Sequence, residues 1–159
     1  MIHTSYQGIP GMLRPFKEYL EQKALPSGAE VVFCGVPGTC TPFVELLCYA
    51  ARSLSCTFIF VPFLDETKSR KMVFTDGIGY QPGELCPVTN PSVIIMMGGL
   101  AMPGMTVTLD QVEALFNAHP DCAKVGICFM NMFEKAGWLE RFSFDILINA
   151  IITVDVLTI

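Results

Sequence analysis

The sequence predicts an α/β protein: a three-layer, doubly wound fold around a mainly parallel sheet of about five strands, flavodoxin-like or Rossmann-like in arrangement. Two observations carry this prediction. Short uninterrupted apolar runs alternate along the chain with amphipathic segments of helical periodicity. The composition is 52% hydrophobic and only 16% charged, as expected when strands are buried on both faces. We expect one domain over residues 1–159.

Five segments have the composition of strands buried in a parallel sheet. Each is a short apolar run without polar alternation, and most are flanked by Gly or Pro punctuation. The predicted strands are residues 31–34, 57–61, 92–97, 124–129 and 142–150. The stretch 151–159 is rich in β-branched residues and fits either a strand or a helix.

Four segments are predicted to be helices. The first covers residues 11–23, where Leu13, Phe16 and Leu20 recur at helical spacing. The second covers residues 42–52, with Thr41 as its N-cap and Pro42 in its first position. A capping box from Thr108 to Gln111 starts the third helix, which runs to about His119, and a short fourth helix covers residues 131–135.

One connection departs from the alternation of strands and helices. Residues 63–91 lie where a crossover helix is expected, yet they lack helical periodicity. Residues 71–75 fit a strand that leads into an Asp76-Gly77 turn. We expect an irregular, lid-like insertion here, because long connections of this kind are commonly lids or binding loops.

Charge and composition exclude several classes of protein. The net charge is −5 and no basic run is present, which argues against a nucleic-acid partner. The long uncharged stretch 85–109 carries Pro87, Pro91 and Pro103, which argues against a membrane span. The start lacks a secretory signal, and the seven cysteines form no CxxC pair, so we expect reduced thiols and a cytoplasmic protein.

The loop after the first predicted strand is the first candidate binding site. Ligands of open parallel sheets bind at the carboxyl ends of the strands, and this loop runs directly into a helix, whose first amides favour an anion. The candidate ligand-binding residues are Gly35, Gly38, Thr39, Cys40 and Thr41. The alternative is a tight turn that needs glycine and a cap for geometric reasons alone. Neither Gly-Lys-Ser/Thr nor GxGxxG is present in it.

Two further loops should reach the same edge of the sheet. Gly98 and Gly99 follow the third strand and suggest either close contact with a ligand or a plain turn. Asn131 and Glu134 follow the fourth strand and are placed to hydrogen-bond a ligand. The alternative is that Asn131 caps the short helix and Glu134 complements its dipole.

Catalytic residues are not evident from the sequence, which leaves open whether the protein is an enzyme. Cys40 is a weak candidate nucleophile, because a thiolate is stabilised near a helix start. An inert thiol is the alternative, and neither His3 nor His119 is placed as an obvious base. Cysteine phosphatases use a Cys-x5-Arg loop with an essential arginine. If Cys34 were the cysteine of such a loop, the arginine position would be occupied by Cys40, so a phosphatase is disfavoured. With two histidines, no metal site is expected.

Three stretches of the chain resemble a known family. They are residues 34–43, residues 98–103, and residues 128–135 with Gly137-Trp138. The resemblance runs through most of the chain and is to an uncharacterised family of small α/β proteins from methanogenic archaea. It implies an anaerobic, reducing cytoplasm and brings no known activity.

Two functions remain open from the sequence. The first is binding of a small anionic ligand, a nucleotide or phosphorylated coenzyme, including flavin-like coenzymes, at the carboxyl ends of the parallel strands. The second is a non-catalytic interaction module that assembles with itself, most simply as a homodimer. The second rests on the apolar segment 146–159, which should be buried against the domain or a second subunit.

Overall fold

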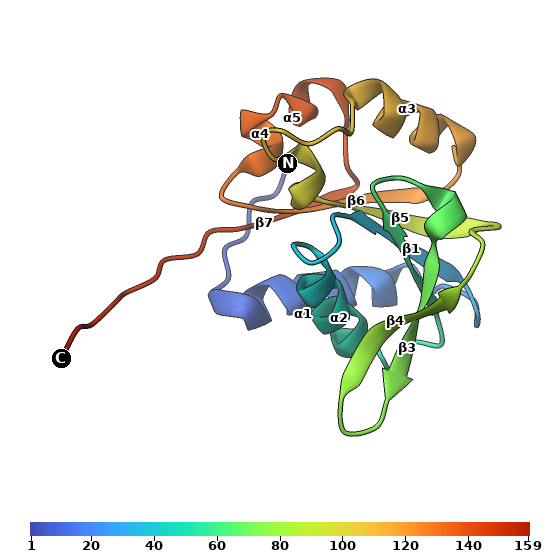
Figure 1. The fold of residues 1–159 in the computed structure, drawn as a ribbon, viewed down its shortest axis with the longest axis horizontal. Helices are drawn as coiled ribbons and strands as arrows, with labels where there is room; N and C mark the ends of the chain where they lie inside the picture. Colours follow the sequence, from blue (N-terminus) through green and yellow to red (C-terminus); the bar gives the residue numbers. More distant parts are fainter.

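A computed structural model describes all 159 residues and contains one seven-stranded sheet with helices on both faces (Figure 1). The strand order is β4-β3-β2-β1-β5-β6-β7. Neighbouring strands are parallel from β2 to β7, whereas β3 and β4 are antiparallel additions at one edge. The parallel strands are β1 (Glu30–Gly35), β2 (Thr57–Pro62), β5 (Pro91–Met97), β6 (Ala123–Phe129) and β7 (Ile146–Ala150). The α/β class is thus confirmed, with seven strands in place of about five.

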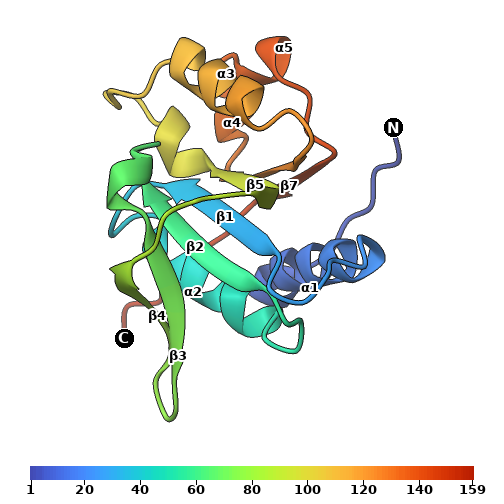
Figure 2. The same ribbon diagram turned by 90° about the vertical axis from the view of Figure 1, so that its right-hand side faces the viewer.

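The helices form a layer on each side of the sheet (Figures 1 and 2). One layer contains α1 (Gly8–Gln22) and α2 (Thr41–Ala50). The other contains α3 (Leu109–Ala118), α4 (Met132–Lys135) and α5 (Trp138–Arg141). The predicted capping box of α3 is present, with the Thr108 hydroxyl and the Gln111 side chain satisfying each other's backbone N–H. None of the helices is both long and apolar enough to cross a membrane.

The strand and Asp76-Gly77 turn expected at residues 71–77 are confirmed, whereas the description of residues 63–91 as an irregular insertion is wrong. After the short 3-10 helix η1 (Glu66–Lys68), strands β3 (Arg70–Thr75) and β4 (Gly79–Leu85) form an antiparallel hairpin that extends the sheet beyond β2. The turn at Asp76-Gly77 closes it, with Gly77 at φ +77°. Pro82 and Gly83 obscured the strand in the sequence, and both are tolerated in β4 because it is an edge strand.

Two predicted boundaries also change. α2 begins at Thr41, so its N-cap is Cys40 and not Thr41. The Thr41 hydroxyl instead accepts a hydrogen bond from the Gly38 N–H at 3.1 Å. β7 begins at Ile146 and not at residue 142, because Phe142 packs its ring against Trp138 at 5.8 Å and belongs to the helical layer.

Aromatic rings fill the interior on both faces of the sheet. On the α1 side, the ring of Phe33 in β1 lies 5.8 Å from that of Phe16 and 6.3 Å from that of Phe58. On the opposite side, the ring of Phe133 in α4 stacks on Trp138 at 4.8 Å and on Phe144 at 5.4 Å. Phe16, Phe33 and Phe133 are fully buried.

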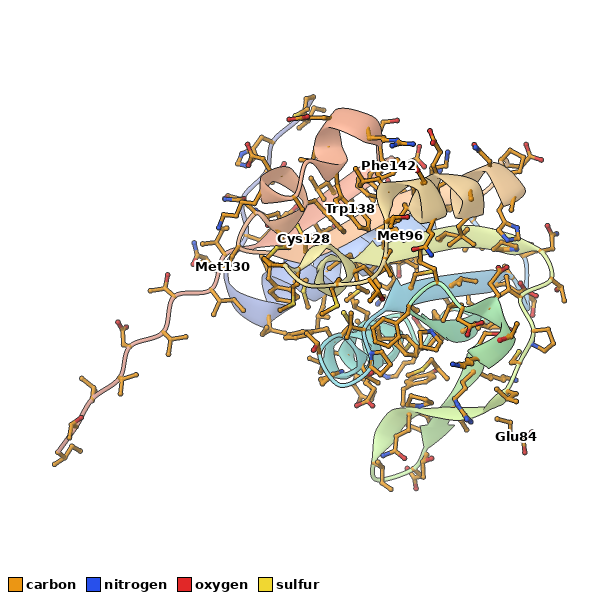
Figure 3. All side chains as sticks on the ribbon, turned by 45° about the horizontal axis from the view of Figure 1, so that its top comes forward. Glu84, Met96, Cys128, Met130, Trp138 and Phe142 are labelled. Carbon is orange, nitrogen blue, oxygen red and sulfur yellow. The ribbon has the colours of Figure 1, made fainter.

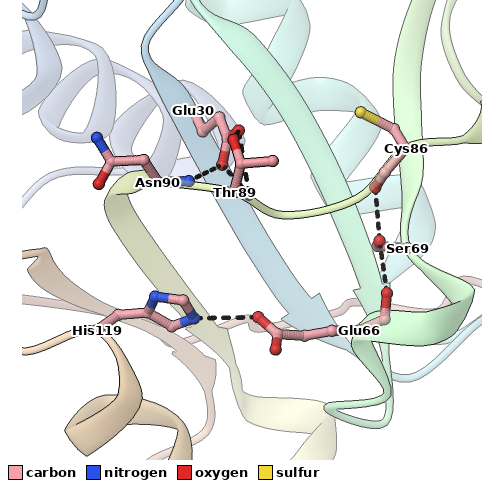
Figure 4. A network of polar contacts seen from close by, with 7 residues as sticks. All are labelled: Glu30, Glu66, Ser69, Cys86, Thr89, Asn90 and His119. Carbon is pink, nitrogen blue, oxygen red and sulfur yellow. Dashed lines mark hydrogen bonds and ion pairs between the residues drawn. The ribbon is translucent and has the colours of Figure 1, made fainter.

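Polar contacts fix the connections around the hairpin (Figure 4). The Glu30 carboxylate accepts hydrogen bonds from the N–H groups of Thr89 and Asn90, each at 3.0 Å, and so holds the segment that enters β5. The buried Ser69 hydroxyl lies within hydrogen-bond distance of the Glu66 and Cys86 carbonyls. His119, at the end of α3, pairs with Glu66 at 3.1 Å, which joins the helical layer to η1.

Candidate functional site at the carboxyl edge of the parallel strands

The loop that follows β5 contacts both the β1–α2 loop and the end of β6, at the carboxyl edge of the parallel strands where the sequence predicted that these loops would meet. Gly99, in the 3-10 helix η2 (Gly98–Ala101) after β5, packs on Cys40 of the β1–α2 loop. Gly98 packs on Cys128 of β6. The edge is therefore one continuous surface made from three separate loops.

The glycines at this edge make room for cysteines. A methyl group on Gly35 would lie 2.8 Å from the Cys40 Cβ, and one on Gly99 would lie 2.5 Å from the Cys40 Sγ. A methyl group on Gly98 would lie 2.5 Å from the Cys128 Cβ. Such distances are too short for any real carbon neighbour. Packing therefore explains Gly35, Gly98 and Gly99 without a ligand.

Cys40 lies in an environment that disfavours a nucleophilic role. Its side chain is only 3% exposed, and burial raises the pKa of its thiol, although backbone hydrogen bonds from Val36 and Gly99 favour the thiolate. Neither histidine is hydrogen-bonded to it, since His119 pairs with Glu66 and His3 lies in the exposed N-terminal segment. The arrangement fits a neutral, structural thiol.

The most buried thiols should make the free energy of unfolding depend on pH. Burial raises the pKa of Cys34 and Cys48 well above the ordinary 9.0, so both stay protonated in the folded chain while the unfolded chain ionises. The free energy of unfolding should therefore fall above pH 9, by up to about 1.4 kcal/mol per pH unit for each thiol. Urea unfolding between neutral and alkaline pH measures this, and Cys48→Ala should flatten the decline. If the free energy of unfolding falls as steeply with pH in Cys48→Ala as in the parent chain, Cys48 is not one of the thiols responsible.

The exposed part of the site is the turn between β1 and α2. Pro37, Gly38 and Thr39 are exposed, and Gly38 has φ +79° with open space where a side chain would be. The Gly38 N–H is used by the Thr41 hydroxyl. The backbone N–H groups of Thr39 and Thr41 have no intramolecular hydrogen-bond partner. Two amide donors are thus free beside the start of a ten-residue helix.

The β6–α4 loop is held by an asparagine pair. Its two first residues, Met130 and Asn131, both have left-handed backbone angles, with φ 54° and 59°. The Asn149 Oδ1 accepts from the Asn131 N–H at 3.0 Å and from the Cys128 thiol at 3.4 Å, and its Nδ2 donates to the Asn131 Oδ1. Figure 3 labels Cys128, near the end of β6, and Met130, the first residue of the loop. The loop is therefore tied to the end of β7.

Asn131 and Glu134 differ in whether their side chains already have partners within the chain. The Asn131 side chain does not cap α4, contrary to the structural alternative considered from the sequence, and it is taken up by Asn149. Glu134 is exposed and makes no ion pair. The sequence analysis missed Asn149, although an amide at the end of an otherwise apolar strand was a readable signal.

The loop after β2 also reaches this edge, which the sequence analysis did not anticipate. Phe63 and Leu64 have left-handed φ angles of 48° and 64°. The Phe63 N–H donates to the Gly35 carbonyl at 3.1 Å, which holds the loop against the end of β1. Phe63 is 45% exposed. An exposed aromatic residue therefore follows β2, with its backbone held at the end of β1.

Comparison with known families identifies the relatives of this chain. Residues 7–153 match the model of a family described as an uncharacterized protein conserved in archaea (DUF2124). The chain belongs to this family. The resemblance to an uncharacterised family of methanogenic archaea is thereby confirmed, and the family description names no activity.

Two relatives and one solved structure come from methanogens. An uncharacterized protein of Methanothermobacter thermautotrophicus is 38% identical, over 91% of this chain and 90% of the relative. The uncharacterized protein MJ1183 of Methanocaldococcus jannaschii is 36% identical, over 94% and 89%. A crystal structure of a protein of unknown function from M. thermautotrophicus has a TM-score of 0.87 and 36% identity, over 99% of this chain and 97% of that chain. This chain thus shares its fold with that protein.

Proposed function

We propose that this protein binds a small anionic molecule, a nucleotide or a phosphorylated coenzyme, at the carboxyl edge of its parallel strands. The proposal rests on the β1–α2 turn, where the N–H groups of Thr39 and Thr41 are free beside the N-terminus of α2. Amides at a helix start point their donors and the positive end of the helix dipole toward an anion. Gly38, Thr39 and Thr41 are the residues we assign to its phosphate or carboxylate group.

The strand order also favours a binding site at the carboxyl ends of β1 and β5. Taken alone, the parallel strands follow the order β2-β1-β5-β6-β7, which is the flavodoxin-like order. The chain leaves β1 for α2 on one face and leaves β5 for α3 on the other. The crossovers therefore diverge between β1 and β5, and open α/β sheets bind their ligands at such a switch point.

Affinity for a ligand requires more than the helix start. One anion at a helix N-terminus gains about 0.3–1 kcal/mol when exposed, which is far short of stable binding. Phe63 is exposed and its backbone is bonded to the end of β1, so its side chain would offer a face on which a base or flavin ring can stack. Glu134 and the Asn131 Nδ2, which Asn149 does not engage, would contribute polar contacts from the β6–α4 loop.

The test is an NMR titration with inorganic phosphate, AMP and FMN as probes. We expect the amide signals of Thr39 and Thr41 to shift, and the affinity to fall at least tenfold in Gly38→Leu. Gly77→Leu is the matched control, because Gly77 has nearly the same φ and equally open surroundings at the tip of the β3–β4 hairpin. Unshifted Thr39 and Thr41 signals with all three probes, or unchanged binding in Gly38→Leu, would refute the proposal.

A further inference from the structure

The segment after β7 is apolar and has almost no contact with the rest of the chain. Residues 151–159 form no helix or strand, and each of them is exposed. Val156 is 83% and Leu157 88% exposed. Figure 1 shows this segment leaving the end of β7 and extending away from the remainder of the protein. Burial against its own chain, one of the two outcomes expected from the sequence, is therefore not what the structure shows.

The segment continues the side-chain alternation of β7. In β7, Ile146 and Ile148 pair with the buried Val125 and Ile127 of β6. Extending the same period of two gives one face without a polar residue as far as Val156. That face consists of Ile146, Ile148, Ala150, Ile152, Val154 and Val156. The opposite face carries the polar residues Asn149, Thr153 and Asp155, together with the apolar residues Leu147, Ile151, Leu157 and Ile159. Residues 152–156 thus have the alternation of a strand with one buried face, in phase with β7.

β7 itself is an unprotected edge of the sheet. It pairs with β6 on one side and has no strand on the other. The N-terminal residues 1–7 make no backbone hydrogen bond to it. An open edge strand prolonged by an exposed apolar segment is a template for pairing with another chain. Every copy of this protein therefore has both an open edge strand, β7, and an exposed segment, residues 151–159, that can pair with such an edge.

We infer that β7 and residues 151–159 pair antiparallel with the same segment of a second copy, across a twofold axis. Each copy then supplies the strand that covers the other's β7, which makes the interface self-complementary. In such a pairing the apolar faces of the two segments lie on the same side, continuous with the face of β7 that packs on α1. The segment holds no basic residue and the chain carries a net charge of −5, which disfavours an anionic membrane as the occupant.

Light scattering coupled to size exclusion tests this inference. The full chain should have twice the 17.5 kDa mass of one chain. The double variant Val154→Lys/Val156→Lys should have the mass of one chain, because it places charges on the apolar face. Thr153→Lys/Asp155→Lys, on the opposite face of the same segment, should keep the doubled mass. Circular dichroism verifies that both variants are folded.

Three outcomes would overturn the inference. A full chain with the mass of one copy at its highest soluble concentration would exclude self-pairing. A doubled mass in Val154→Lys/Val156→Lys would place the contact elsewhere on the molecule. Dissociation by Thr153→Lys/Asp155→Lys to the same extent would show that the face assignment is wrong. The mass measurement does not depend on the NMR titration with phosphate. If the protein fails to bind phosphate, AMP or FMN, the conclusion about self-pairing is unaffected.

Discussion

Replacing Gly98 with alanine is expected to destabilise the protein by about 3 kcal/mol, at the upper end of overpacking costs. The added methyl group would lie 2.5 Å from the Cβ and 2.8 Å from the Cα of Cys128. Both atoms are fixed to the backbone of β6, a strand with neighbours on both sides, so neither can move aside. Urea unfolding of Gly98→Ala against the parent chain gives the difference directly.

Gly99→Ala supplies the control for this prediction. Its added methyl group would meet the Cys40 Sγ at 2.5 Å, and the next atom, on Val36, lies at 3.5 Å. Cys40→Ala removes that sulfur, so the double variant should recover most of the stability that Gly99→Ala loses. Cys128→Ala should give no such recovery to Gly98→Ala, because the clashing Cβ and Cα remain. Recovery in both pairs, or in neither, would contradict the packing described here.

Phe133→Ala is expected to cost about 3–5 kcal/mol, as for other buried phenylalanines. Phe133 is fully buried and stacks on Trp138 and Phe144, so its ring joins α4, α5 and the segment that enters β7. α4 has only four residues and little stability of its own. The loss should therefore also loosen the loop at Asn131, visible as weakened amide protection there.

Leu139→Ala is the matched comparison for Phe133→Ala. Leu139 lies in α5, next to Trp138, but is 40% exposed. Its truncation should cost less than about 1 kcal/mol, since little apolar surface is lost from the interior. Equal losses in the two variants would show that the Phe133 cluster does not hold this layer together.

The parallel part of the sheet was predictable because its strands leave a strong local signal. Runs such as Val31–Cys34 and Ile94–Met97 are apolar at every position, which only strands buried on both faces require. Only the first half of the antiparallel hairpin left a signal, in the predicted strand 71–75 and its Asp76-Gly77 turn. β4 reads Gly-Tyr-Gln-Pro-Gly-Glu-Leu, and its pairing depends on β3 and on the edge position of β4, not on its own composition.

The sheet edge that carries the candidate site was predictable, but the packing of its residues was not. The sequence shows glycines after β1 and β5 and shows a helix start, which suffices to locate the edge. It does not show that Cys40 fills the space beside Gly99, because the two residues are far apart along the chain and meet only through the sheet. The same holds for Asn131 and Asn149. Contacts of this kind follow from strand order, which single-sequence patterns do not encode.

The hairpin at the β2 edge divides the protein into two parts of unequal cooperativity. β3 is joined to β2 over two residue pairs, whereas β1 is joined to β2 over six. Beyond those pairs, the hairpin is held by the buried Met72, by ring contacts of Phe74 and Tyr80 with Tyr49 and Phe58, and by the Ser69 hydrogen bonds at its base. Local opening of β3 and β4 thus leaves every parallel pairing intact, whereas separation of β1 from either neighbour divides the sheet in two. We therefore expect the hairpin to be the part of this fold that opens locally while the parallel strands stay paired.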